Sequence, residues 1–500
     1  MNVVLLTVDC LRYDRCGFNG YYGETTPILD RLAESSYVFD RAYAPGPWTA
    51  ASFPGILAGH HAPTIAYQDT LPRKAVPHGS PTIATQLGDD GYSTIATVTN
   101  PQLSAERNFD RGFDRFVNLK RESRPNSEST SEGTRDSAID ALKSTISDRI
   151  SDEELLARLR GRSQLLNPHT VLFACRRLSM IRNAPDEWPT DRGETVVDRF
   201  TAELTDAADE QPFFAWTHLM DLHAPIHPAL TTRDGSTARG LGRYLLADTV
   251  RASDGQPTRY SRLYDKALRY TDTQIGRVVD TLRSAGVWND TVLIVTSDHG
   301  EAIGERGVNG HRNHYPYDEL LHVPLLVRVP DSDEDGDRID VPFSLSWLHE
   351  LTAEVLDIEP MDLPAGSPSG THLGDIDDGR LVVADSLTAF GHTVVVRDRQ
   401  HKLIKHFDSW IPTDRTRRYE FMRHFGVRTT DFDSGVFDPL NATYRPLVDP
   451  CERIPRPEAA APSDLHERAT EIHTHADDLQ RIDGQPDAET ERMLRDLGYF

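Results

Sequence analysis

The stretch NVVLLTVD, residues 2–9, decides the fold class of this 500-residue chain. Residues 2–8 are a nearly unbroken run of Val, Leu and Thr, a pattern typical of a strand that is buried on both faces. Such strands belong to parallel sheets, whose ligands bind beyond the carboxyl ends of the strands. The run ends directly on Asp9. The stretch therefore predicts an α/β fold with a functional edge that begins at Asp9.

Two later strand-like runs also end on polar side chains. The segment QPFFAWTHLMD (211–221) ends on Asp221, with His223 two residues further, and TVLIVTSDHGE (291–301) carries Asp298 and His299. Between these runs, apolar residues recur at helical spacing over 26–36, the first part of 81–100, 194–207 and 269–286. Strands that alternate with helices predict a mainly parallel sheet covered on both faces.

The rhythm of strands and helices changes twice along the chain. A polar and helical insertion interrupts it at about 115–193, within an α/β domain predicted at 1–340. The remainder, 341–500, is predicted to be a C-terminal subdomain with an acidic, Pro-rich tail that ends in a short helix. Its short strands, RLVVADS (380–386), HTVVVRD (392–398) and HKLIKHF (401–407), predict a small antiparallel sheet.

The net charge of the chain limits the classes of partner that it can bind and indicates the salt concentration of its surroundings. The formal net charge is −24, and only six of the 54 basic residues are Lys. We expect adaptation to high salt, because concentrated ions screen the self-repulsion of such a surface. Nucleic acid and anionic membranes are excluded as general partners, since both need a basic face. No secretory signal or membrane span is recognisable in the sequence, which predicts a cytoplasmic location. The oligomeric state stays open.

Asp9, Asp298 and His299 are the strongest candidates for chemistry. Two carboxylates and an imidazole at neighbouring strand ends predict one divalent metal ion. The oxygen ligands favour Ca²⁺, Mg²⁺ or Mn²⁺, whereas the histidine leaves Zn²⁺ open. The sequence NGHRNHYPYDELLH (309–322) also contains three histidines. A second ion is not expected there, because no further carboxylate cluster accompanies them.

The stretch PWTAASFPGILAG, residues 47–59, allows two interpretations of Thr49. Pro47 favours a helix start, and the hydroxyl of Thr49 or Ser52 would cap that helix. Alternatively Thr49 is a nucleophile, since the N-terminus of a helix favours a bound anion.

Several of these segments, taken together and in order, resemble the sulfatases of the alkaline phosphatase superfamily. The resembling segments are VVLLTVDCLRYDRCG (3–17), TPILDRLAESSYVFDRAYA (26–44), RGFDRF (111–116), PFFAWTHLMDLHAPIHP (212–228), SDHGEAIGERGVNGHRNHYPYDELLHVPLLVRVP (297–330), VVVRDRQHKLIKH (394–406) and LRDLGYF (494–500). The resemblance implies a three-layer α/β/α sandwich with a mostly parallel central sheet and a small C-terminal antiparallel sheet.

The resemblance also assigns residues. It implies that Asp9, Asp298 and His299 are metal ligands and that Thr49 stands at the position of the nucleophile, where it also contacts the metal. His223 falls on a substrate-contacting histidine and His311 on a basic position near the transferred group. Either imidazole would assist by protonating the leaving oxygen. Asp221 is a candidate substrate-binding residue or a partner that orients His223.

The chain departs from the sulfatase pattern at the nucleophile. Typical sulfatases carry Cys-x-Pro-Ser-Arg, whose Cys becomes formylglycine, but residues 49–53 read TAASF. No formylglycine is therefore expected, and Phe53 stands where the Arg would be. Cys10 replaces a second metal-site Asp, and a Gly-Lys-x-His block is missing. In the region of that block, Asn100 is a candidate substrate-binding residue and oxygen donor.

These residues predict a metal-dependent hydrolase of sulfate or phosphate-type esters with a Thr nucleophile. The expected substrate is a small-molecule or glycan ester. Two alternatives stay open, namely transfer of the group to a glycan or lipid head group and a catalytically inactive binding protein. The resemblance implies that the threonine favours phosphate esters or phosphonates, because a threonine nucleophile is found in phosphodiesterase and phosphotransferase branches of the superfamily, where the metal lowers the pKa of its hydroxyl.

Overall fold

The computed structural model of the protein describes residues 1–61, 65–67, 75–122, 191–209, 212–224, 226–227, 230, 260–308, 310–330, 336–364, 373, 379–388, 391–407, 441–475 and 480–482. Most of the predicted insertion and the predicted helix at 490–500 lie outside these residues. No helix within the described ranges is both long enough and apolar enough to cross a lipid bilayer.

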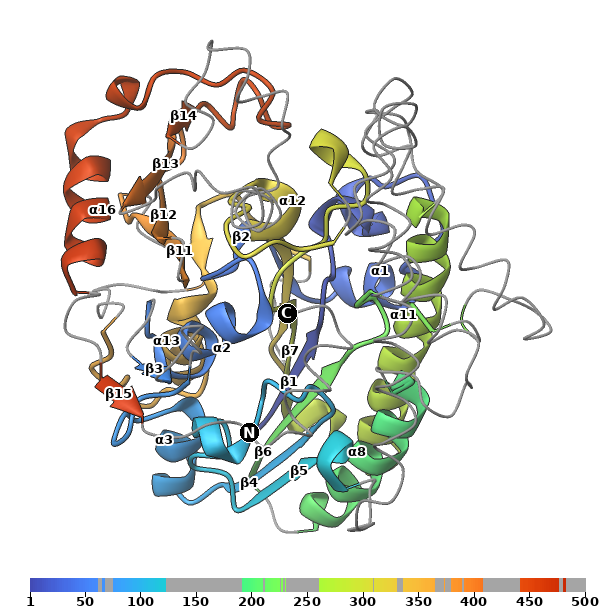
Figure 1. Ribbon diagram of the computed structural model, residues 1–500. Coiled ribbons are helices and arrows are strands. Elements are labelled where there is room, and N and C mark those ends of the chain that lie inside the picture. Colours follow the sequence, from blue (N-terminus) through green and yellow to red (C-terminus); the bar gives the residue numbers. More distant parts are fainter. Residues whose placement is uncertain are drawn as a thin grey trace, which may run out of the picture.

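A large twisted sheet forms the centre of the molecule (Figure 1). Its main strands run in the order β10-β2-β8-β7-β1-β6-β4-β5, and β9 pairs with β2. All pairings are parallel except those of β8, which is antiparallel to both β7 and β2. The strands are β1 (Asn2–Val8), β2 (Tyr37–Tyr43), β4 (Ser93–Val98), β5 (Arg115–Asn118), β6 (Phe213–Leu219), β7 (Thr291–Ser297), β8 (His322–Arg328), β9 (Arg338–Ile339) and β10 (Phe343–Ser344).

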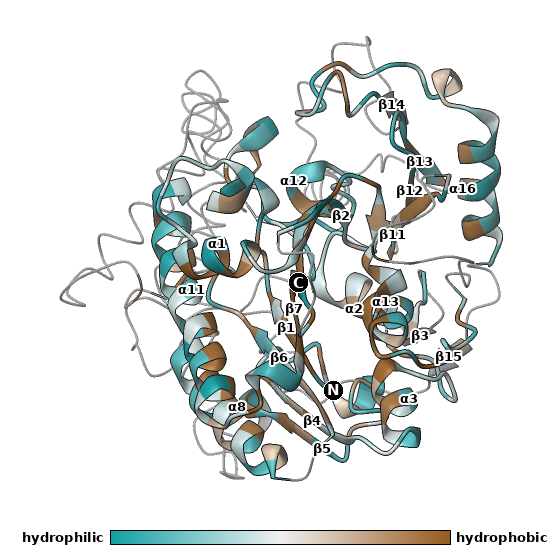
Figure 2. Cartoon of the chain, turned by 180° about the vertical axis from the view of Figure 1, so that it is seen from behind, coloured by the Kyte–Doolittle hydropathy of each residue, from teal (hydrophilic) through white to brown (hydrophobic). Residues whose placement is uncertain are grey.

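Helices cover both faces of this sheet. One layer contains α1 (Pro27–Ala33), α8 (Gly193–Ala208) and α11 (Tyr260–Ser284), and the other contains α2 (Thr49–Ala58), α3 (Ile83–Asp89) and α13 (Leu348–Val355). Strand β1 alternates between the layers, since Val4 and Leu6 pack in the core under α8 and α11, whereas Val3 and Leu5 pack in the core under α2 and α3. Figure 2 shows the matching pattern, with hydrophobic central strands and mixed colouring along α8 and α11. The predicted three-layer sandwich is confirmed.

The smaller sheet is antiparallel, as predicted, and has the order β11-β12-β13-β14. Its strands are β11 (Val382–Thr388), β12 (Gly391–Arg397), β13 (Lys402–Phe407) and β14 (Ala442–Tyr444). Helix α16 (Ser463–His475) buries Leu465, Ala469 and Ile472 against it. The short elements β3 (Ile65–Tyr67) and β15 (Gln480–Ile482) pair with each other, and α4 (Leu119–Glu122) and α12 (Asp318–Leu321) are single turns.

Two boundaries differ from the sequence pattern. Helix α11 begins at Tyr260, nine residues before the predicted start, because Tyr260, Tyr264 and Leu268 continue its buried stripe. Strand β10 and helix α13 lie beyond residue 340 but belong to the large sheet and its core. The domain division at 340 stays a prediction.

The register of the central strands explains why polar side chains gather at one edge. Thr7 of β1 lies beside Thr296 of β7 and beside His218 of β6. Since all three strands are parallel, the residues that follow them, Asp9, Asp298 and Asp221, leave the sheet at the same edge.

Candidate active site

Three buried acceptor groups meet at this edge of the sheet. Asp9 follows β1, whereas Asp298 and His299 follow the neighbouring strand β7. His299 Nε2 lies 3.8 Å from Asp9 Oδ1 and 3.5 Å from Asp298 Oδ2. One ligand atom from each residue lies within 4.8 Å of the others, and all three side chains are fully buried. The structure therefore brings together the three residues that the sequence singled out for a metal.

The electrostatics of this cluster favour a cation. Burial opposes charge on His299, yet the carboxylates of Asp298 and Asp9 raise its pKa. Burial raises the pKa of Asp298, while His223, His218 and His299 outweigh burial and hold the pKa of Asp9 well below its usual range.

The orientation of His299 suits a metal ligand. Its Nδ1–H donates to the Gly300 carbonyl at 2.7 Å, which leaves Nε2 facing the two carboxylates. Within the described part of the chain, no Lys or Arg forms an ion pair with Asp9 or Asp298, and Asp298 Oδ2 has no hydrogen-bond partner. These observations fit a divalent ion held by Asp9, Asp298 and His299.

Thr49 lies against this cluster. Its Oγ1 is 3.3 Å from Asp9 Oδ2, 3.4 Å from His299 Nε2 and 3.4 Å from Asn100 Nδ2. Thr49 is the first residue of α2, whose N-cap residue, Trp48, makes no capping hydrogen bond with its side chain. Ser52 donates instead to the Gly46 carbonyl at 2.7 Å. The capping interpretation is wrong for both residues, and the Thr49 hydroxyl faces the candidate metal site.

The amide of Asn100 has a fixed orientation. Its Oδ1 accepts the backbone N–H of Gln102 at 2.9 Å, so Nδ2 must point the other way. Nδ2 donates to Asp9 Oδ2 at 3.2 Å and lies close to Thr49 Oγ1. In this orientation the oxygen faces the backbone of Gln102, and the expectation of a substrate-binding role and an oxygen donor at Asn100 stays a prediction. Toward Asp9 the residue presents a hydrogen-bond donor.

His218 belongs to the site but was not predicted. Its Nε2 lies 3.4 Å from Asp9 Oδ2, and its Nδ1 lies 2.9 Å from Thr7 Oγ1. The one signal in the sequence is a histidine inside the apolar run of β6. That signal becomes meaningful only through the pairing of His218 with Thr7, which a single sequence does not reveal.

Glu301 was also missed, and it connects the two predicted catalytic histidines to the cluster. Its Oε2 lies 2.8 Å from His311 Nδ1, and the ring of His311 lies 4.9 Å from that of His223 and 4.6 Å from that of His299, between centroids. Although burial opposes ionisation, His311 lowers the pKa of Glu301. Burial lowers the pKa of His223 to about 4, so this imidazole is neutral at neutral pH.

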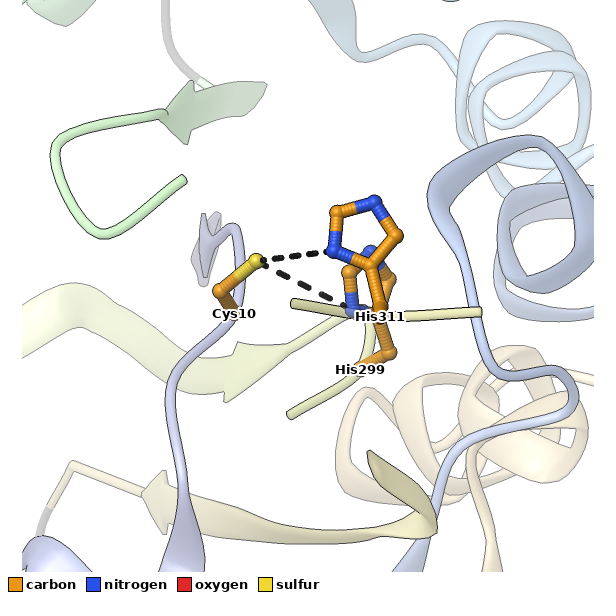
Figure 3. A group of neighbouring side chains, drawn as sticks. All are labelled: Cys10, His299 and His311. Carbon is orange, nitrogen blue, oxygen red and sulfur yellow. Dashed lines mark hydrogen bonds between the residues drawn. The ribbon is translucent and has the colours of Figure 1, made fainter. Parts of the chain in front are cut away.

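Cys10 lies beside Asp9 on a strained backbone, with φ +64°. Its Sγ is 2.8 Å from Asp9 Oδ1, 3.2 Å from Glu301 Oε2 and 3.7 Å from His311 Nδ1. Figure 3 shows Cys10 facing the rings of His299 and His311. Burial, together with the carboxylates of Asp9 and Glu301, raises the pKa of this thiol.

The other histidines of the 309–322 segment contact different parts of the molecule. His314 Nδ1 lies 2.6 Å from Thr393 Oγ1 on the smaller sheet. His322 stacks on Tyr13 and hydrogen-bonds the Asp40 carbonyl. His311 alone among the three contacts Glu301 and Cys10.

Asp221 lies at the N-terminus of α8. Its Oδ1 accepts the N–H of Gly193 at 2.8 Å, and a Cβ added at Gly193 would lie 2.3 Å from Asp221 Oδ2. The negative carboxylate thus faces the positive end of a helix. Its role in substrate binding stays a prediction.

We expect Asp221 to make the stability of the protein depend on pH. Burial raises its pKa to about 7 in the folded chain, whereas an unfolded Asp titrates at about 3.9. Its contribution to stability is therefore complete below about pH 4 and is lost as the pH rises through about 7. Between about pH 5 and about pH 8, the free energy of unfolding should fall more in the wild type than in Asp221→Asn. The difference between the two falls should be on the order of 2 to 3 kcal/mol.

Urea unfolding of both proteins at the two pH values measures this difference. Asp206→Asn, which removes an exposed carboxylate of the same helix, is the matched control and should follow the wild type. Equal pH dependence in wild type and Asp221→Asn would contradict the prediction.

Phe53 stands where the resemblance to sulfatases implies an Arg. It is fully buried, and its ring meets His218 edge-on at 5.0 Å and Trp216 at 5.2 Å, between centroids. The ring therefore supports the histidine that contacts Asp9. Phe53→Ala should lower the free energy of unfolding by about 3 to 5 kcal/mol, because it leaves a cavity in the core.

Chemical denaturation measures this cost, and Phe53→Leu, which retains much of the volume, should lose less. A loss below about 1 kcal/mol in Phe53→Ala would show that the surrounding side chains collapse into the space.

Comparison with known proteins identifies the same family, the sulfatases, along most of the chain. The family model described as Sulfatase matches residues 1–358. The arylsulfatase of Clostridium perfringens is 24% identical over 410 residues, which cover 76% of this chain and 79% of that protein. The iduronate 2-sulfatase of Homo sapiens is 24% identical over 370 residues, or 66% of this chain and 60% of that protein.

A solved structure, the phosphonate monoester hydrolase of Agrobacterium radiobacter, shares the fold with a TM-score of 0.57 and 17% identity. The match covers 95% of this chain and 96% of that one. The chain therefore belongs to the sulfatase family, and the two relatives named above are sulfuric ester hydrolases.

Proposed function

We propose that this protein is a metal-dependent hydrolase that attacks sulfate or phosphate-type esters with the hydroxyl of Thr49. The observation that carries the proposal is the contact of Thr49 Oγ1 with Asp9, His299 and Asn100 at the cluster of buried acceptors. A hydroxyl at that position is a weak nucleophile by itself and needs activation. A divalent ion bound by Asp9, Asp298 and His299 would lower the pKa of this hydroxyl and neutralise the oxygens of the transferred group.

The protein groups around Thr49 supply the remaining parts of the first step. Asp9 Oδ2 accepts a hydrogen bond from Thr49 Oγ1 and thereby orients the oxygen toward the substrate. Asn100 Nδ2 donates to Asp9 Oδ2 at 3.2 Å and to Thr49 Oγ1 at 3.4 Å, and so holds both groups in place. The start of α2 adds backbone N–H groups and the positive end of a helix.

His311 is the better of the two histidines for protonating the leaving oxygen. Its contact with the Glu301 carboxylate at 2.8 Å fixes the orientation of the ring. His223 is neutral at neutral pH, so we assign it to hydrogen bonding with the substrate. The ring of His311 lies beside that of His299, and the ring of His223 lies beside that of His311.

Phosphate-type esters are the favoured substrates. Thr49 excludes the formylglycine on which typical sulfatases depend, and a threonine hydroxyl attacks phosphorus directly. Sulfate esters stay within the proposal, because sulfate presents similar tetrahedral oxygens to the same donors.

The test is a panel of nitrophenyl sulfate, phosphate, phosphodiester and phosphonate substrates, assayed in high salt with Mn²⁺, Mg²⁺, Ca²⁺ or Zn²⁺. We expect turnover of at least one phosphorus ester and, after rapid acid quench, a phosphorylated peptide containing Thr49. Product appearing only with a glycan or lipid acceptor would favour transfer. Metal binding without turnover of any substrate would overturn the proposal in favour of a binding protein.

A further inference from the structure

A second group of potential ligands lies beside the first cluster. Cys10 Sγ is 3.2 Å from Glu301 Oε2 and 3.7 Å from His311 Nδ1, and the last two atoms are 2.8 Å apart. Cys10 and Glu301 are fully buried. Thiolate, imidazole and carboxylate are the ligand types that Zn²⁺ prefers in proteins.

The spacing of these atoms is close to that of a tetrahedral zinc site. Bonds of about 2.3 Å to sulfur and about 2.0 Å to nitrogen or oxygen place neighbouring ligand atoms about 3.3 to 3.6 Å apart. The two distances from Cys10 Sγ, 3.2 and 3.7 Å, lie close to that range. The shorter contact between Glu301 and His311 is that of a hydrogen bond, which an ion would replace with a slight separation.

We propose that Cys10, Glu301 and His311 form a second metal site, which takes a thiophilic divalent ion such as Zn²⁺. The site adjoins the one formed by Asp9, Asp298 and His299, since Cys10 Sγ lies 2.8 Å from Asp9 Oδ1, but it uses different ligand atoms. His299 lies between them, and although its Nδ1 is 4.0 Å from Cys10 Sγ, that nitrogen donates to the Gly300 carbonyl. His299 therefore offers only Nε2, which faces the first site.

Glu301 supplies an independent observation in favour of an ion. Its Oε1 is buried and has no hydrogen-bond partner within the described ranges. A buried carboxylate oxygen without a partner is costly, and a bidentate contact with a cation would satisfy it. A second ion was not expected from the sequence, because no carboxylate cluster accompanies the histidines of 309–322. Glu301 precedes that segment in the chain and brings a carboxylate to His311.

The second site does not depend on whether Thr49 is the nucleophile, although it adjoins the same groups. An ion and a proton compete for His311 Nδ1. While an ion occupies the second site, His311 therefore does not act as the acid of the proposed reaction.

The experiment measures metal content and the ligand spectrum rather than turnover. The full-length protein is stripped with a chelator, titrated with Co²⁺ under reducing conditions and analysed by elemental analysis and absorption spectroscopy. We expect two Co²⁺ per chain and a thiolate-to-cobalt charge-transfer band. Cys10→Ser and Glu301→Gln should each bind one Co²⁺ fewer, and Cys10→Ser should lose the band. Titration with Zn²⁺ should displace the Co²⁺ and remove the band from the wild type.

Two further variants make the result decisive. Cys16→Ser changes another buried thiol of the same segment, outside the cluster, and should retain both ions and the band. Asp298→Asn should lose one ion and keep the band.

Saturation at one ion without the band would overturn the proposal. The proposal would also be overturned if the wild type bound a single Co²⁺ and both Cys10→Ser and Asp298→Asn lost the charge-transfer band. Cys10 would then belong to the first site. Circular dichroism of each variant establishes that it is folded.

Discussion

Replacing Thr49 by alanine is expected to lower kcat by on the order of 10³- to 10⁶-fold, with little change in KM. The variant lacks the oxygen that lies among Asp9, His299 and Asn100, and no other hydroxyl of the residues that the structure describes makes those contacts. The fold should persist, because Thr49 does not cap α2. Steady-state assays on the best phosphorus ester, together with the melting temperature, measure both effects.

Two matched variants separate a nucleophile from a packing residue. Thr49→Ser keeps the hydroxyl and should retain measurable turnover, whereas Ser52→Ala removes the neighbouring hydroxyl that bonds to Gly46 and should keep kcat within about tenfold. Full activity in Thr49→Ala would rule out the proposed nucleophile.

Removing divalent metal is expected to abolish turnover and to lower the melting temperature by several degrees. Asp9 and Asp298 are fully buried beside each other, and a bound ion relieves the repulsion between them. An ion present at about 100 times its dissociation constant would stabilise the folded state by about 2.7 kcal/mol. Calorimetry with and without a chelator measures this shift, and adding back each metal shows which ions restore activity.

Asp298→Asn identifies the site responsible. This variant should have low activity with or without metal, and its melting temperature should respond less to the chelator than that of the wild type. Unchanged activity of the wild type after complete removal of metal would contradict the assignment of Asp9, Asp298 and His299.

The fold was predictable from local patterns. The buried run at 2–8, the strand at 291–297 and the helix at 194–207 each carry a periodicity that belongs to one type of element, and the structure contains β1, β7 and α8 there. The smaller sheet was predictable for the same reason. Helix α11 shows the limit, since the apolar spacing recognised at 269–286 continues back through Leu268 and Tyr264 to Tyr260.

The site was predictable only in part, because contacts between strands depend on register. Asp9, Asp298 and His299 follow strands directly, so the topology of a parallel sheet is enough to bring them together. His218 lies inside a strand and needs the pairing with Thr7, while Glu301 reaches His311 through a loop. The orientation of Asn100 depends on a single backbone hydrogen bond.

That hydrogen bond has a consequence for ligand selection. The side-chain amide of Asn100 cannot turn over without breaking the bond from Gln102 N–H, so its outward atom is always a nitrogen. That nitrogen faces Asp9 Oδ2 and Thr49 Oγ1, which both accept from it. A ligand oxygen that displaced either acceptor would take over its hydrogen bond, whereas a hydroxyl hydrogen or an ammonium group would meet a hydrogen of Asn100. The peptide group of Gln102 thus decides which atom of Asn100 a ligand would meet.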